Sequence, residues 1–225
     1  MSDDTELHTD VARQIDELAI PRGRPLIISD ADEVLADFMT GFEAYLGHRG
    51  LYFTWREYKL NGHILRRSDD TAIENAAVGA LVGDFFADRV DQLAPVEGAA
   101  TAIGALSRRA QVVVLSNVPS TERARRQDWL KRHGMDVPLV ANIGVKGPAV
   151  RELAARAAAP TYFIDDSPRH HETVARDAGH VWRLHFVANR RLAALIGPAP
   201  ASHHRVDDWP AARALIEADL TARGY

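Results

Sequence analysis

Apolar runs of strand length alternate with amphipathic segments of helix length along most of the chain. The runs lie at residues 25–29, 111–116, 138–142, 161–165 and 180–186. Segments with apolar residues at helical spacing lie at residues 121–133, 148–158 and 170–178. Strands that alternate with helices of this length predict a parallel sheet that helices cover on both faces. The pattern therefore predicts an α/β protein.

One interval departs from this alternation. Ser29 and Gln111 are separated by about eighty residues, whereas a crossover between parallel strands needs only about a dozen. Residues 97–109 supply the helix that leads into the second strand. Residues 36–95 are therefore expected to form an insertion, which has helical patterns at both ends and an aromatic and basic middle. We expect this insertion to be a small helical cap over the sheet.

The remainder of the chain is expected to form the core. Residues 1–35 and 96–225 make up this predicted α/β domain. Residues 3–18 have the pattern of an amphipathic helix, which is expected to pack on the outside. The final segment, residues 209–223, is expected to form a closing helix, since Pro210 stands at a position that suits the first helical turn.

Composition and charge exclude several classes of protein. The 225 residues are 46% hydrophobic and 26% charged, and the formal net charge is −4. Because the chain has no basic excess, we expect neither a polynucleotide nor an anionic membrane as partner. No cysteine is present, which excludes disulfides, thiolate zinc sites and thiol nucleophiles. The acidic N-terminus is unlike a signal peptide, so a cytoplasmic location is expected.

Polar residues follow several of the predicted strands at their carboxyl ends, where open parallel sheets bind ligands. In chain order they are Asp30, Asp32, Ser116, Asn117, Lys146, Asp165 and Asp166. Each has an ordinary explanation when it is taken alone: a serine often caps a helix, a lysine is usually on the surface, and an acidic pair is usually a solvated turn. Their occurrence together at one sheet edge favours an active site.

The set resembles the four motifs of the haloacid dehalogenase-like superfamily of hydrolases. The matching stretches are "IISDADEV", "VVVLSN", "GVKGPAV" and "YFIDDSP". The resemblance covers residues 24–35 and 96–190, and the insertion lies where that superfamily places its first type of cap. It implies a Rossmann-like core with this cap after the first strand. The run "VLADF" is similar to the 5′-deoxyribonucleotidases of the same superfamily.

The resemblance implies roles for the acidic residues. Asp30 would be the nucleophile that forms an aspartyl-phosphate, and Asp32 would protonate the leaving oxygen and then deprotonate water. Mg²⁺ would be held by the Asp30 carboxylate, the Asp32 carbonyl and the acids Asp165 and Asp166. Hard carboxylate oxygens suit this ion, and acids packed together tolerate one another when they share a divalent cation.

The remaining motif residues would bind the phosphoryl group. By the same resemblance, Ser116 and the Asn117 amide would contact its oxygens, while Lys146 would pair with Asp30 and the phosphate. The expected activity is Mg²⁺-dependent hydrolysis of a small phosphate monoester, such as a nucleotide or a sugar phosphate. Two alternatives stay open: a catalytically weak binding or regulatory protein with this fold, and a metal-independent dehalogenase, which the retention of Asp32 disfavours.

Two features bear on the substrate. Glu33 stands where the superfamily usually has glycine, and we expect its side chain to point to solvent; the alternatives are contact with the surroundings of the metal or with a substrate hydroxyl. The cap carries aromatic residues among basic ones. We expect these aromatic side chains to form the core of the cap, and stacking on a base is the alternative.

Overall fold

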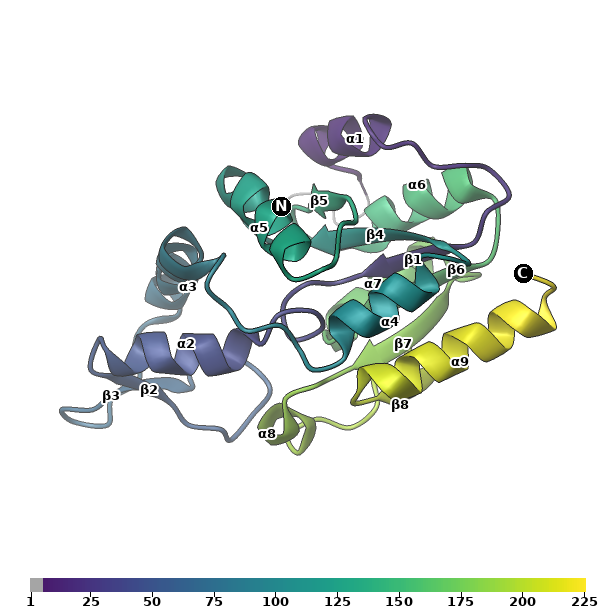
Figure 1. Cartoon of the computed structure of the whole chain (residues 1–225). Coiled ribbons are helices and arrows are strands. Elements are labelled where there is room, and N and C mark those ends of the chain that lie inside the picture. Colours follow the sequence, from purple (N-terminus) through teal and green to yellow (C-terminus); the bar gives the residue numbers. More distant parts are fainter. Residues whose placement is uncertain (1–5) are drawn as a thin grey trace.

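A single sheet with six parallel strands forms the centre of the molecule. The computed structural model describes residues 6–225, and its strand order is β5-β4-β1-β6-β7-β8 (Figure 1). The strands are β1 (Leu26–Ser29), β4 (Gln111–Ser116), β5 (Leu139–Ala141), β6 (Thr161–Asp165), β7 (Trp182–Phe186) and β8 (His204–Val206). The predicted strands are therefore confirmed, and β8 is an edge strand that the sequence pattern did not reveal.

Helices cover both faces of the sheet, as predicted. One face carries α1 (Thr9–Asp16), α6 (Gly147–Ala157) and α7 (Pro168–Asp177), and the other carries α4 (Ala99–Leu106), α5 (Arg123–Arg132) and α9 (Trp209–Ala222). A 3-10 turn, Ser120–Glu122, precedes α5, and a short helix α8 (Arg190–Ala193) follows β7. Residues 3–5 of the predicted first helix lie outside the described residues.

Alternation along the strands explains why two separate cores form. In β1, Ile27 packs into the cluster beneath α4, α5 and α9, whereas Leu26 and Ile28 pack into the cluster beneath α1, α6 and α7. Successive side chains of a strand point to opposite faces, so a continuous apolar run supplies both layers. Every residue of β1 is buried.

The segment between β1 and α4 lies outside the central sheet. It contains α2 (Phe38–Gly47), an antiparallel hairpin of β2 (Leu51–Phe53) and β3 (Ile64–Arg66), and α3 (Asn75–Arg89). Figure 1 shows these elements grouped at one end of the molecule. The two expected helical ends are present, and the aromatic middle forms a hairpin where a helical cap was expected.

The aromatic side chains of this segment divide into two groups. Tyr45 packs with Phe42 and Phe85 in an aromatic cluster between α2 and α3, with ring centroids 5.1–6.4 Å apart. Trp55 and Tyr58 instead contact the core domain: Arg191 lies over the Trp55 ring, and the Tyr58 hydroxyl reaches Asp166. The expected aromatic core of the inserted segment is therefore present and includes Tyr45. Trp55 and Tyr58 lie outside it, at the boundary with the core domain.

Two hydrogen bonds pair the outgoing and returning chains where the inserted segment begins and ends. Asp37 N donates to Ala94 O at 2.9 Å, and Val96 N donates to Leu35 O at 2.8 Å. These bonds hold the outgoing and returning chains together directly after the acidic loop that follows β1. Across residues 6–225, no helix is both long enough and apolar enough to cross a membrane.

Candidate active site

Lys146 lies at the centre of a buried charge cluster. Its Nζ is 2.8 Å from Asp30 Oδ1 and 2.7 Å from Asp165 Oδ2, and its side chain is completely buried. Asp30 directly follows β1 and Asp165 ends the adjacent β6, so the parallel register brings both carboxylates to the same edge of the sheet. Lys146 reaches them from the N-terminus of α6. These three residues, predicted from separate motifs, are in direct contact.

Asp166 completes a cluster of three acids. One carboxylate oxygen from each of Asp30, Asp165 and Asp166 lies within 4.8 Å of the others. Burial, together with the charge of Asp165, raises the pKa of Asp30 to about 7 even though Lys146 lowers it. Burial and the two neighbouring acids also raise the pKa of Asp166 well above its ordinary range. The pKa of Asp165 is lowered. Burial alone would raise it, and the attraction of the Lys146 ammonium is stronger than this effect of burial.

When ionised, the three clustered acids carry more negative charge than the Lys146 ammonium balances. Lys146 bonds two of these acids, Asp30 and Asp165. A hard divalent cation fits such a set, because it prefers carboxylate oxygens and its charge would compensate the repulsion. The three carboxylates could therefore hold such an ion.

Asp32 has a different partner from the other acids. Its Oδ1 accepts a hydrogen bond of 2.7 Å from Nη2 of Arg126, whose side chain is completely buried on α5. The Arg126 guanidinium lies 6.0 Å from the Phe86 ring centroid and 5.4 Å from that of Trp129. Its Nε and Nη1 have no hydrogen-bond partner within the part of the chain that the structure describes. Arg126 is a site residue that the sequence reasoning missed.

Ser116 and Asn117 lie at the end of β4, which neighbours β1. Ser116 is buried, and its Oγ accepts a bond of 3.2 Å from Val118 N. The Asn117 side chain donates to Gly144 O at 2.8 Å and accepts from Asn142 Nδ2 at 2.8 Å. The side chain of Asn117 therefore holds the loop that precedes Lys146. Both residues share the sheet edge with Asp30, as expected, without contacting it.

Glu33 does not point to solvent, so that expectation was wrong. Its side chain is 4% exposed, and its Oε1 accepts a 2.5 Å hydrogen bond from Met39 N in the first turn of α2. The backbone at Glu33 has a φ of 63°, in the left-handed region that glycine adopts without strain. This turn folds the side chain inward, beneath the N-terminus of α2. Burial raises its pKa to about 8.

A cavity of about 170 Å³ lies beside Asp166. Its wall is mainly apolar and combines residues of the inserted segment and the core: Glu33, Phe38, Met39, Phe53, Tyr58, Lys59, Leu60, Asp166 and Leu192. The Tyr58 hydroxyl donates to Asp166 Oδ2 and lies 3.0 Å from the Asp166 carbonyl oxygen. The inserted segment therefore reaches the acidic cluster directly through Tyr58.

Comparison with known proteins identifies the fold. No known family model and no curated protein sequence matches the chain. Its structure is similar to that of a haloacid dehalogenase-like protein of unknown function from Agrobacterium tumefaciens, with a TM-score of 0.62, 18% identity, and 88% and 99% of the two chains covered. It is also similar to the structure of a HAD family hydrolase from Deinococcus radiodurans with bound phosphate and sodium. Here the TM-score is 0.61, the identity is 17%, and 90% of this chain and 98% of the other are covered. This chain has the haloacid dehalogenase-like fold.

A third structure extends the comparison within this fold. A putative beta-phosphoglucomutase from Thermotoga maritima is 16% identical, with a TM-score of 0.53 and 86% and 99% of the two chains covered. Identities this low establish the fold alone. The haloacid dehalogenase-like architecture predicted from the four motifs is confirmed, and the activity must be argued from the site.

Proposed function

We propose that the protein is a Mg²⁺-dependent phosphatase that hydrolyses a small phosphate monoester. The observation that carries this proposal is the acidic cluster with a buried lysine at its centre, placed at the carboxyl edge of the sheet beneath an inserted segment. The phosphate bound to the similar Deinococcus hydrolase supports it. In this proposal residues 36–95 are the cap, residues 1–35 and 96–225 are the core, and the location is cytoplasmic.

Asp30 is the proposed nucleophile. Its free carboxylate oxygen attacks phosphorus and the ester oxygen leaves, which gives an aspartyl-phosphate and an alcohol. Lys146 fixes the Asp30 carboxylate through a 2.8 Å contact and supplies positive charge beside the transferred group. Asp32 donates its proton to the leaving oxygen and then accepts a proton from the water that hydrolyses the intermediate.

The other motif residues bind rather than react. The carboxylates of Asp30, Asp165 and Asp166, with the Asp32 carbonyl, would hold Mg²⁺, which when bound neutralises charge on the phosphoryl oxygens. Ser116, through its hydroxyl, and Asn117, through its backbone amide, are proposed to donate hydrogen bonds to those oxygens. This assignment uses donors at the end of β4, next to the strand that carries Asp30.

Hydrolysis of p-nitrophenyl phosphate tests the proposal. We expect turnover with Mg²⁺, loss of turnover in EDTA, and loss in Asp30→Asn, which keeps the size of the side chain but cannot act as the nucleophile. Asp136→Asn, at an exposed position away from the site, is the matched control and should leave turnover unchanged.

Three results would reject the proposal. Turnover that survives in Asp30→Asn would exclude the nucleophile. Halide release from a 2-haloacid in EDTA, without phosphatase activity, would assign the protein to metal-independent dehalogenation. Binding of phosphate esters without turnover across a broad panel would indicate a binding or regulatory protein.

A further inference from the structure

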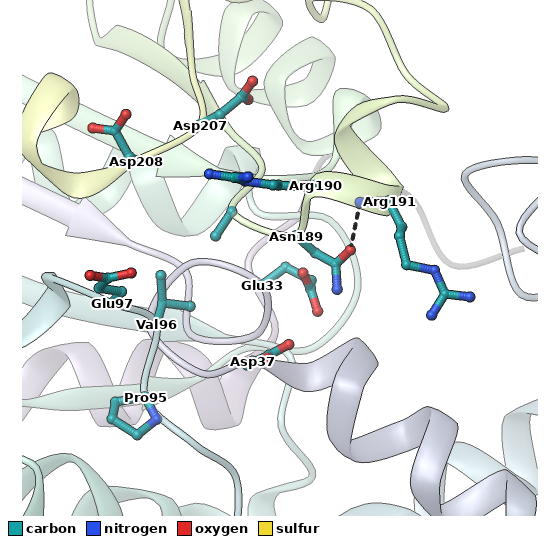
Figure 2. A pocket seen from close by; sticks show the side chains of 11 residues that line it. Glu33, Asp37, Pro95, Val96, Glu97, Asn189, Arg190, Arg191, Asp207 and Asp208 are labelled. Atoms are coloured by element: carbon teal, nitrogen blue, oxygen red, sulfur yellow. Dashed lines mark hydrogen bonds between the residues drawn. The ribbon is translucent and has the colours of Figure 1, made fainter.

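Glu33 lines two cavities. One is the apolar cavity beside Asp166, and the other is a larger one of about 540 Å³, whose lining residues Figure 2 shows. Among residues 6–225, Glu33 alone lines both. A ligand that extends from the acidic cluster toward the larger cavity would therefore pass this carboxylate.

The walls of the two cavities differ in chemistry. The cavity beside Asp166 is lined mainly by aromatic and aliphatic side chains, such as Phe38 and Leu192. The larger cavity carries amide and charged groups, among them Asn189, Arg190 and Asp207. Figure 2 shows the Glu33 carboxylate pointing into this polar space. Glu33 thus marks the boundary where an apolar wall becomes polar.

Only one oxygen of the Glu33 carboxylate is used by the fold. Oε1 accepts the bond from Met39 N, whereas within the described residues no donor bonds Oε2. Capping of α2 does not require Glu33, because Asp37 is the N-cap residue and its Oδ1 accepts from Thr40 N at 3.3 Å. Oε2 is not among the buried side-chain atoms that lack a partner, so it is accessible to solvent and to a bound ligand.

The backbone at this position is also costly to maintain. A residue other than glycine with a φ of 63° is disfavoured by about 1–2 kcal/mol. Strain of this kind persists where the surrounding structure requires the side chain, and it is concentrated at ligand sites. Glycine at this position would remove the strain and the carboxylate together.

We infer that Glu33 is a specificity-determining residue that accepts a hydrogen bond from a hydroxyl or ammonium group on the leaving alcohol of the substrate. The inference rests on the proposed phosphatase function, because the phosphoryl group must occupy the acidic cluster for the leaving alcohol to reach Glu33. It names the substrate class: esters whose leaving group has an apolar body and a hydrogen-bond donor. Where Glu33 is ionised, at a pH above about 8, a second anionic group there would be repelled and is selected against.

Matched pairs of esters provide the test. We compare 2-aminoethyl phosphate and 2-hydroxyethyl phosphate with ethyl phosphate, which lacks the donor, and measure kcat/KM in the wild type, Glu33→Ala and Glu33→Gln. Removal of the acceptor should lower the preference for the donor-bearing esters at least tenfold in Glu33→Ala. Glu33→Gln should lose the preference for the ammonium ester while it retains part of the preference for the hydroxyl ester.

The ratio of rates separates recognition from structure. Weaker capping of α2 would lower activity on all three esters equally and leave the ratio unchanged. Asp37→Asn, which alters the N-cap, and Glu97→Gln, at an exposed acid on the wall of the larger cavity, are the controls and should keep the wild-type ratio. A wild-type ratio in Glu33→Ala overturns the inference.

Binding to a non-turnover variant distinguishes this inference from the proposed function. Calorimetric titration of the three esters into Asp30→Asn should show a preference for the donor-bearing esters that Asp30→Asn/Glu33→Ala lacks. That result without any wild-type hydrolysis would reject the phosphatase and retain the role of Glu33. Equal affinities for the three esters, or binding of none, would overturn the role of Glu33 even if p-nitrophenyl phosphate is hydrolysed.

Discussion

Replacement of Lys146 by methionine tests the charge balance of the site. Methionine has a similar length and remains apolar, so it fills the buried space without creating a large cavity. The change removes the ammonium that lies 2.8 Å from Asp30 and 2.7 Å from Asp165. Two buried carboxylates then lose their counterion, while the third acid, Asp166, still lies within 4.8 Å of both.

The expected loss of stability is large. Removal of one partner from a buried ion pair destabilises a protein by about 3–5 kcal/mol, because the remaining charge stays desolvated. Lys146 is completely buried and contacts two acids, so the upper half of this range is expected. For a chain of this size about 4 kcal/mol corresponds to a fall in Tm of roughly 8–16 °C.

Urea and thermal unfolding measure the effect, with Lys131→Met at an exposed position of α5 as the control. The deficit of the Lys146 variant should shrink between pH 7.5 and pH 5, because its unpaired acids take up protons in the folded state as the pH falls. It should also shrink in millimolar Mg²⁺, since the unbalanced acids of the variant should bind the cation more tightly than the wild-type cluster does, and ligands that bind only the folded state stabilise it. An unfolding midpoint equal to that of the wild type at pH 7.5 would refute the assigned charge balance.

Three further results are expected. Arg126→Met should lower kcat/KM about 100-fold for alkyl phosphates and much less for p-nitrophenyl phosphate, whose p-nitrophenolate leaves without a proton, because Asp32 loses the donor that orients it; equal losses in kcat/KM would contradict a general-acid role of Asp32. Gly147→Ala should destabilise by about 1–3 kcal/mol in urea unfolding, since an added Cβ would lie 2.6 Å from a backbone oxygen of α7, whereas Gly104→Ala, which meets open space in α4, should stabilise by about 0.5–1 kcal/mol. Burial lowers the pKa of His185 to about 4, so the folded state keeps it neutral while the unfolded chain is protonated below about 6.5; the free energy of unfolding should fall from pH 6.5 toward pH 4, and less steeply in His185→Gln.

The fold was predictable where apolar runs and helical periodicity agreed. The run at residues 25–29 is flanked by polar residues, and β1 occupies Leu26–Ser29 with every side chain buried. The edge strand β8 was missed because it has three residues, only one of which is buried. The hairpin in the inserted segment was missed for a similar reason: its strands have three residues each and are joined by a long polar connection.

The candidate site was predictable in its charged centre and not in its surroundings. Asp30, Lys146 and Asp165 follow or precede regular elements, so sheet topology alone brings them to one edge. Arg126 was missed because α5 carries several arginines, and sequence spacing does not indicate which one is buried beneath Asp32. The burial of Glu33 depends on a left-handed backbone turn, which no apolar pattern reports.

The charge inventory links the metal proposal to the phosphoryl chemistry. Asp30 and Asp165 bond Lys146, Asp166 lies beside these two acids, and the fourth acid, Asp32, is paired with Arg126. The three clustered acids therefore exceed Lys146 by two negative charges when all groups are ionised. A bound divalent cation would bring this sum to zero. An incoming phosphate dianion would then meet a neutral cluster with a cation at its surface, rather than acids that repel it. The charge excess that destabilises the metal-free site would therefore be the source of its affinity for the cation.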